Sequence, residues 1–156
     1  MNPLIPAGLV LITLSSCGNP TGKQAATRSD VLETWADGSP RKTVIRDAST
    51  NETLSEIELY DNETTFREWK FKAGLKNGES RSFREDGKPW SLNSYVNDTL
   101  HGPYRTWHEN GQLYIDGTYT MGVRSGIWNF YAPDGRLVRT HDFTAAPSII
   151  DTTAAP

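Results

Sequence analysis

The sequence has little cysteine, a low share of apolar residues and no excess of positive charge. Cys17 is the only cysteine in 156 residues, which excludes a disulfide within the chain and a metal site built from several cysteines. The net charge of −3 provides no basic excess to neutralise phosphates, so we do not expect nucleic acid as a partner. Apolar residues make up 36%, below the roughly 45–50% of a compact globular protein.

Aromatic residues, by contrast, are abundant. The chain has five Trp, six Tyr and five Phe, whereas disordered chains are poor in aromatic residues. A composition rich in rings and poor in aliphatic residues favours thin β-structure, in which a few rings cover a small core. The composition therefore predicts a folded, β-rich protein.

The N-terminal segment has the pattern of an export signal. Residues 4–14 form an apolar run that is too short for a bilayer span of about 20 residues but has the length of a signal-peptide core. The run ends in Leu14-Ser15-Ser16-Cys17, which resembles the lipobox of bacterial lipoproteins. This resemblance implies cleavage before Cys17 and acylation of its thiol, because two or three acyl chains give stable membrane anchoring.

One feature of this segment departs from the usual export signal. Residues 1–16 contain no Lys or Arg, although a signal peptide normally begins with positive charge. An apolar strand with a buried cysteine is the alternative interpretation. On the lipoprotein interpretation, we predict a signal peptide over 1–16, a flexible tether over 17–33, a repeat array over 34–143 and a disordered tail over 144–156.

Internal repetition is the strongest signal in the sequence. Two series of glycines recur every 24 residues: Gly78, Gly102 and Gly126, and Gly87, Gly111 and Gly135. Aromatic residues recur at the same interval, as at Phe83, Trp107 and Tyr131. The best copies span 75–143, and a degenerate copy upstream has Glu63 in the place of Gly87.

Each repeat has the pattern of a β-hairpin. The pairs at 37–38, 86–87, 110–111 and 134–135 are Asp-Gly or Asn-Gly, which predict type I′ turns because both residues tolerate positive φ. The segments 76–78, 100–102 and 124–126 are predicted to be the loops between hairpins. Apolar and polar residues alternate between these points, so we predict strands of about 6–8 residues. The predicted fold is all-β: an elongated antiparallel β-meander of tandem hairpin repeats of about 24 residues.

Two segments carry a family resemblance. Residues 102–119 and 126–137 resemble the MORN-type repeat in its bacterial variant, which occurs in proteins often labelled YwqK-family antitoxins. The resemblance implies a β-hairpin repeat fold with protein–protein or protein–membrane contacts and without catalytic residues or a cofactor.

Four tryptophans are candidate contacts for a partner: Trp69, Trp90, Trp107 and Trp128. Trp69 and Trp90 do not recur, and a binding site usually breaks a repeat that a core must obey. The alternative for the recurring rings is that they pack the sheet. The three histidines, His101, His108 and His141, show no convergence toward a metal site.

We therefore predict a lipid-anchored bacterial envelope protein, in the outer membrane or facing the periplasm, that binds a protein partner without catalysis. The alternatives are a structural spacer that contacts the membrane surface and an antitoxin-like protein that neutralises a partner. An enzyme is not expected, because no nucleophile, phosphate-binding or metalloprotease motif occurs. A glycan hydrolase would require two carboxylates about 5–10 Å apart in a pocket.

Overall fold

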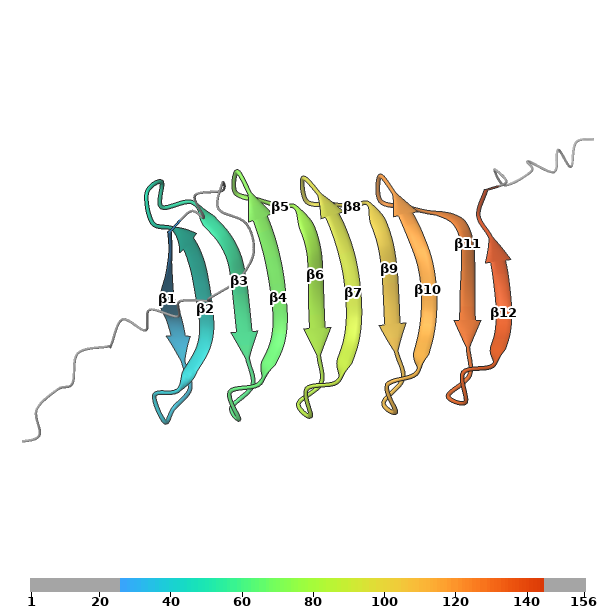
Figure 1. Ribbon diagram of the computed structural model, residues 1–156, viewed down its shortest axis with the longest axis horizontal. Helices are drawn as coiled ribbons and strands as arrows, with labels where there is room; N and C mark the ends of the chain where they lie inside the picture. Colours follow the sequence, from blue (N-terminus) through green and yellow to red (C-terminus); the bar gives the residue numbers. More distant parts are fainter. Residues whose placement is uncertain (1–25, 145–156) are drawn as a thin grey trace, which may run out of the picture.

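The computed structural model describes residues 26–144. In this part of the chain, twelve strands form one sheet in which each pair of neighbours is antiparallel, and no helix occurs. Figure 1 shows the strands side by side in a single elongated layer. The predicted all-β meander is therefore confirmed. The predicted signal peptide, the acylation site at Cys17 and all of the predicted tail except Thr144 lie outside the described residues.

The strands follow one another across the sheet almost entirely in chain order. The path runs β1-β2-β3-β4-β6-β7-β9-β10-β11-β12, while the two-residue strands β5 and β8 pair with β4 and β7. Their bounds are β1 (Thr27–Thr34), β2 (Pro40–Asp47), β3 (Thr53–Leu59), β4 (Thr65–Lys72), β5 (Leu75–Lys76), β6 (Gly78–Phe83), β7 (Pro89–Val96), β8 (Thr99–Leu100), β9 (Gly102–Trp107), β10 (Leu113–Thr120), β11 (Val123–Tyr131) and β12 (Leu137–Asp142).

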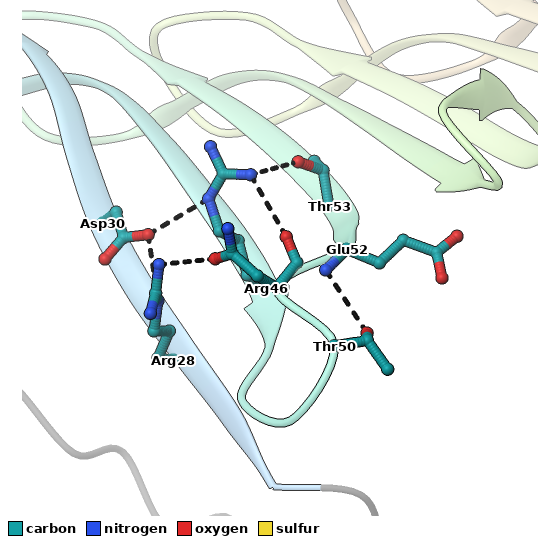
Figure 2. A network of polar contacts seen from close by, with 7 residues as sticks. Arg28, Asp30, Arg46, Thr50, Glu52 and Thr53 are labelled. Carbon is teal, nitrogen blue, oxygen red and sulfur yellow. Dashed lines mark hydrogen bonds and ion pairs between the residues drawn. The ribbon is translucent and has the colours of Figure 1, made fainter.

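The array begins earlier than predicted, because β1 occupies the second half of the segment 17–33 that was predicted to be a tether. All of its residues except Asp30 are exposed, so no apolar pattern marks it as a strand. Backbone pairing with β2 and polar side chains stabilise it instead. Figure 2 shows Arg28 and Arg46 converging on Asp30, with Nε–Oδ2 distances of 3.2 and 3.1 Å.

The turns at the Asp-Gly and Asn-Gly pairs differ from the predicted type I′. The Gly87 amide donates to the carbonyl of Arg84 at 2.8 Å, and the Arg84 amide donates to the carbonyl of Lys88 at 2.8 Å. Gly87 has a φ of +79°, whereas Asp86 is not among the residues with positive φ. This is a type I turn followed by a bulge with glycine in the left-handed conformation. The same backbone pattern recurs at Gly38, Gly111 and Gly135. These turns lie at one end of the strands, and the remaining turns lie at the opposite end (Figure 1).

The type I′ turns lie at the opposite end of the strands. Two-residue turns with positive φ at both positions occur at 73–74, 97–98 and 121–122. The predicted loops at 76–78, 100–102 and 124–126 are therefore wrong by a few residues. Gly78 and Gly102 instead begin strands with φ of +103° and +106°, and Gly126 lies inside β11 with φ of +66°.

Glu63 confirms the predicted position of the degenerate copy. Its amide donates to the carbonyl of Tyr60 at 3.1 Å, as Gly87 does to Arg84 one repeat later. Its φ is +63°, a conformation in which a side chain is strained but glycine is not. The hairpin therefore forms at this position despite its unfavourable residue.

Very little apolar surface is fully buried in this single layer. The buried hydrophobic residues of the described part are Val44, Leu92 and Trp128. Side chains beside the turns at the glycine end of the strands join neighbouring repeats. Tyr60 Oη donates to the Phe83 carbonyl at 3.1 Å, and Arg84 Nη2 donates to the Trp107 carbonyl at 3.0 Å. One repeat further on, His108 Nε2 lies 2.8 Å from the Tyr131 carbonyl. This ladder, repeated every 24 residues, ties each hairpin to the next.

Candidate functional site

The strand register separates two faces of the sheet from β4 to β12. Residues opposite each other on paired strands share a face. We call one side the aromatic face; its central row, in sheet order, is Arg67, Ser82, Ser91, Thr106, Ile115, Phe130 and Arg139. We call the other side the ion-paired face; its central row is Glu68, Arg81, Leu92, Arg105, Asp116, Asn129 and Thr140.

Bulges after the turns at Glu63, Gly87 and Gly111 each add one ring to the aromatic face. Ser82 pairs with Ser91, but Phe83 pairs with Pro89, so Trp90 is an extra residue in its strand. Such an extra residue breaks the alternation of side chains and redirects one of them. Trp90 lies beside Thr106 of the aromatic face, although strict alternation would place it with Leu92 on the opposite side. Phe66 and Tyr114 occupy the equivalent positions in neighbouring repeats.

Two adjoining hollows on the aromatic face form the candidate site. Their volumes are about 640 and 350 Å³, and both are lined by Trp90, Tyr104 and Thr106. We call the combined depression the aromatic groove. Its polar lining comes from the side chains of Ser80, Ser82, Ser91 and Asn93. Ser80 and Ser82 are only 4% and 8% exposed, and the Thr106 hydroxyl is buried without a hydrogen-bond partner among the described residues.

Three of the four predicted contact tryptophans line this groove. Trp69 and Trp90 lie in the smaller hollow, and Trp90 and Trp107 in the larger one. Trp90 is 45% exposed, which leaves ring surface for a partner. Trp107 also lines a separate small hollow with Leu92 of the ion-paired face, so only part of it faces the groove.

Trp128 is a packing residue, because it is only 1% exposed and offers no surface to a partner. Its ring stacks on Tyr104 at 5.3 Å and meets Tyr119 edge-on at 5.2 Å. The Trp128 indole donates to the Thr118 carbonyl at 3.2 Å. Gly117 lies beneath this ring, where an added Cβ would come within 2.3 Å of it. The interpretation of the recurring rings as packing residues describes Trp128 correctly.

Cationic side chains lie over the rings of the groove. The Arg67 guanidinium is 4.6 Å from the centroid of Phe66 and 4.8 Å from that of Trp69. The Lys76 ammonium is 5.1 Å from Trp69, and the Arg84 guanidinium is 5.8 Å from Trp90. The buried Nε atoms of Arg67 and Arg84 have no hydrogen-bond partner among the described residues. These are donors that native proteins usually satisfy.

The histidines do not come together. His108 belongs to the edge ladder, the His101 ring accepts a bond from the Met121 amide at 3.4 Å, and the His141 ring lies 4.2 Å from Phe143. Within residues 26–144, no group of three or more His, Cys, Asp or Glu could hold a metal ion. The same stretch contains no helix long and apolar enough to cross a membrane. Burial raises the pKa of Tyr104 above its ordinary value.

The geometry thus defines a class of protein: a repeat sheet of one layer, with a shallow groove of rings, hydroxyls and cations. The family described as MORN repeat variant matches residues 76–97 and 100–120, which run from β5 to the end of β10. This part of the chain is therefore similar to the MORN repeat variant. No curated protein and no solved structure matches the chain.

Proposed function

We propose that this protein is a lipid-anchored, non-catalytic binding module of the bacterial cell envelope, and that the aromatic groove contacts a protein partner. The groove is the observation that supports this function best. Trp, Tyr and Arg are the residues that dominate binding energy at protein interfaces, and the groove presents all three types. An elongated sheet with its repeats joined at the edge holds these side chains in fixed positions, which lowers the entropic cost of binding.

An enzymatic alternative has less support. The groove is lined mainly by rings, hydroxyls and amides, and Glu109 is the carboxylate among the residues of the larger hollow. A glycosidase of the usual kind needs two carboxylates facing each other across the substrate. An antitoxin-like role would require the protein to meet a toxin in the cytoplasm, whereas an exported protein acts outside it.

The anchor is tested by replacing the predicted acylation site. Cys17→Ser should move the protein from the membrane fraction to the soluble fraction, because the thiol that would carry the lipid is lost. Ser15→Ala is the matched control, since it retains a small residue beside the cysteine and should leave the protein in the membrane. Membrane association of both variants would contradict the anchor.

The binding role is tested by crosslinking in intact envelopes, followed by purification of the protein under denaturing conditions. We expect one stoichiometric protein partner, and its recovery should fall about tenfold in Trp90→Ala, as for an interface hot spot. The matched control is Ile127→Ala, because Ile127 is 54% exposed and lies on the ion-paired face. Absence of any partner, or equal loss in both variants, would contradict the proposal.

A membrane-surface spacer is the second candidate function, because exposed rings and cations on one face could also contact lipid headgroups. Flotation of protein lacking residues 1–17 with liposomes of anionic and of neutral lipid separates the two functions. The protein-binding proposal expects no flotation with either lipid. Flotation that is lost in Trp90→Ala would favour the spacer.

A further inference from the structure

The carboxylates in strands β4 to β12 all lie on one side of the sheet. In the strand register, Glu68 lies opposite Arg81, Asp116 opposite Arg105 and Asp142 opposite Ile127. Glu79 is two residues before Arg81 on the same strand. The register therefore places each of them on the ion-paired face. The strands contribute no carboxylate to the aromatic face in this range. Glu109, which lines the larger hollow, belongs to a turn at the edge.

The carboxylates of the ion-paired face are largely matched by cations on the same face. Glu68 pairs with Lys70, Glu79 with Arg81 at 2.6 Å, and Asp116 with Arg105 at 2.8 Å. Three of the four strand carboxylates thus have a partner on their own side. Exposed pairs of this kind contribute little to stability, but they leave little net charge on this face for a ligand.

The cations of the aromatic face have no such partners. Arg67, Lys76, Arg84, Arg124 and Arg139 lie over aromatic rings at 4.3–5.8 Å. None of the five forms an ion pair with another residue of the range 26–144. Glu58 is opposite Arg67 across the strands, yet the guanidinium lies over Phe66 and Trp69. From β4 to β12, the aromatic face therefore has cations over its rings and no strand carboxylate, while Glu56 and Glu58 of β3 continue this face beside Trp69 and Arg67.

We infer that the aromatic groove binds an acidic, extended segment of polypeptide; this inference rests on the proposed function and names the chemistry of its partner. Guanidinium groups that lie over rings can direct the N–H groups that are not already bonded toward carboxylates, which they bind with strong, charge-assisted hydrogen bonds. The rings between them accept apolar or aromatic side chains of the same segment. Hydroxyls and the Asn93 amide can donate to and accept from a peptide backbone.

Binding of synthetic polymers by the full chain carrying Cys17→Ser tests this inference. The three probes are a random copolymer of glutamate and tyrosine, polyglutamate, and polygalacturonate, a polysaccharide with one carboxylate per sugar. We expect the copolymer to bind most tightly, because it supplies both carboxylates and rings. Its affinity should fall more than tenfold between 50 and 500 mM salt, because exposed charges are screened over about 4 Å at the higher concentration.

Charge-neutral variants locate the site. Arg67→Gln and Arg84→Gln together should weaken copolymer binding roughly tenfold, whereas the matched pair Arg81→Gln and Arg105→Gln on the other face should change it less than twofold. Circular dichroism before titration verifies that each variant is folded. Equal losses in the two pairs, tighter binding of polygalacturonate, salt-independent binding or no binding of any polymer would each overturn the inference.

A further experiment distinguishes failure of the acidic-segment inference from failure of the proposed binding role. The crosslinking experiment in envelopes is repeated with the Arg67→Gln and Arg84→Gln variant. Recovery of the same partner at the wild-type level would overturn the acidic-segment inference while the binding role stands. Loss of the partner in this variant, but not in the Arg81→Gln and Arg105→Gln variant, would support both.

Discussion

The two faces of this sheet share one backbone and one strand register, but their cations have different neighbours. On the ion-paired face, Arg81 and Arg105 lie against Glu79 and Asp116. On the aromatic face, Arg67 and Arg84 lie against rings. An exposed ion pair neutralises its own cation, whereas a cation stacked on a ring keeps its full charge. In a sheet of one layer, the faces can therefore diverge in function without any change of fold.

The largest expected change in the free energy of unfolding distinguishes the packing ring of Trp128 from the contact ring of Trp90 on the aromatic face. Trp128→Ala should lower the free energy of unfolding by about 3–5 kcal/mol, because it removes a fully buried ring from a nearly coreless sheet. Trp90→Ala should lower it by less than about 1 kcal/mol, because nearly half of that residue is exposed. Urea denaturation followed by circular dichroism measures both. Similar losses would mean that the aromatic face is one packed layer without a separate contact site.

A smaller loss of stability is expected at Gly117, where the backbone lies close against the Trp128 ring. Gly117→Ala should lower the free energy of unfolding by about 2 kcal/mol, because the new Cβ meets the Trp128 ring and overpacking of this kind costs about 1–3 kcal/mol. Adding Trp128→Tyr should recover part of this loss, because Tyr104 and Asn93 occupy the equivalent positions one repeat earlier. Thermal or urea unfolding of the single and double variants tests the coupling; additive losses would contradict the contact.

The bulges that bring extra rings to the aromatic face depend on a residue with positive φ. Glu63→Gly should raise the free energy of unfolding by about 1 kcal/mol, because glycine adopts this conformation without strain. The reverse change in a regular repeat, Gly87→Ala, should lower it by a similar amount. Urea midpoints report both variants. An unchanged midpoint in Glu63→Gly would show that the degenerate turn stores no strain.

The smallest effect concerns a turn outside both faces. Hydrogen bonds from the Ser49 hydroxyl and from the Thr50 and Ser49 amides lower the pKa of Asp47 from 3.8 to about 2. Because the folded-state pKa is the lower one, the contribution of Asp47 to stability is present above pH 4. It is lost as the pH falls from about 4 to 2. The unfolding midpoint of Asp47→Asn, measured between pH 2 and 6, should change less with pH in this window than that of the wild type. Identical pH profiles would contradict this assignment.

The sequence predicted the class of fold because glycines and rings repeat at a fixed interval and a repeat must fold in the same way each time. It failed at β1, where pairing with β2 and the Asp30 contacts stabilise a strand without an apolar pattern. It also misassigned the turns: an Asp-Gly pair satisfies both a type I′ turn and a type I turn with a bulge. Trp69 and Trp90 were predicted to contact a partner because they do not recur. The structure places both in the groove, but Phe66 and Tyr114 occupy the positions equivalent to Trp90, so an aromatic residue does recur there.

The repeat interval, the hairpins and the absence of a basic excess were thus determined by the amino-acid sequence alone, because each depends on local residue type and spacing. The side of the sheet that each ring and charge occupies was decided only by the tertiary structure. One extra residue in a bulge moves a side chain to the opposite face. For that reason, neither the groove around Trp90 nor the separation of its unmatched cations from the carboxylates is visible before the strands are aligned.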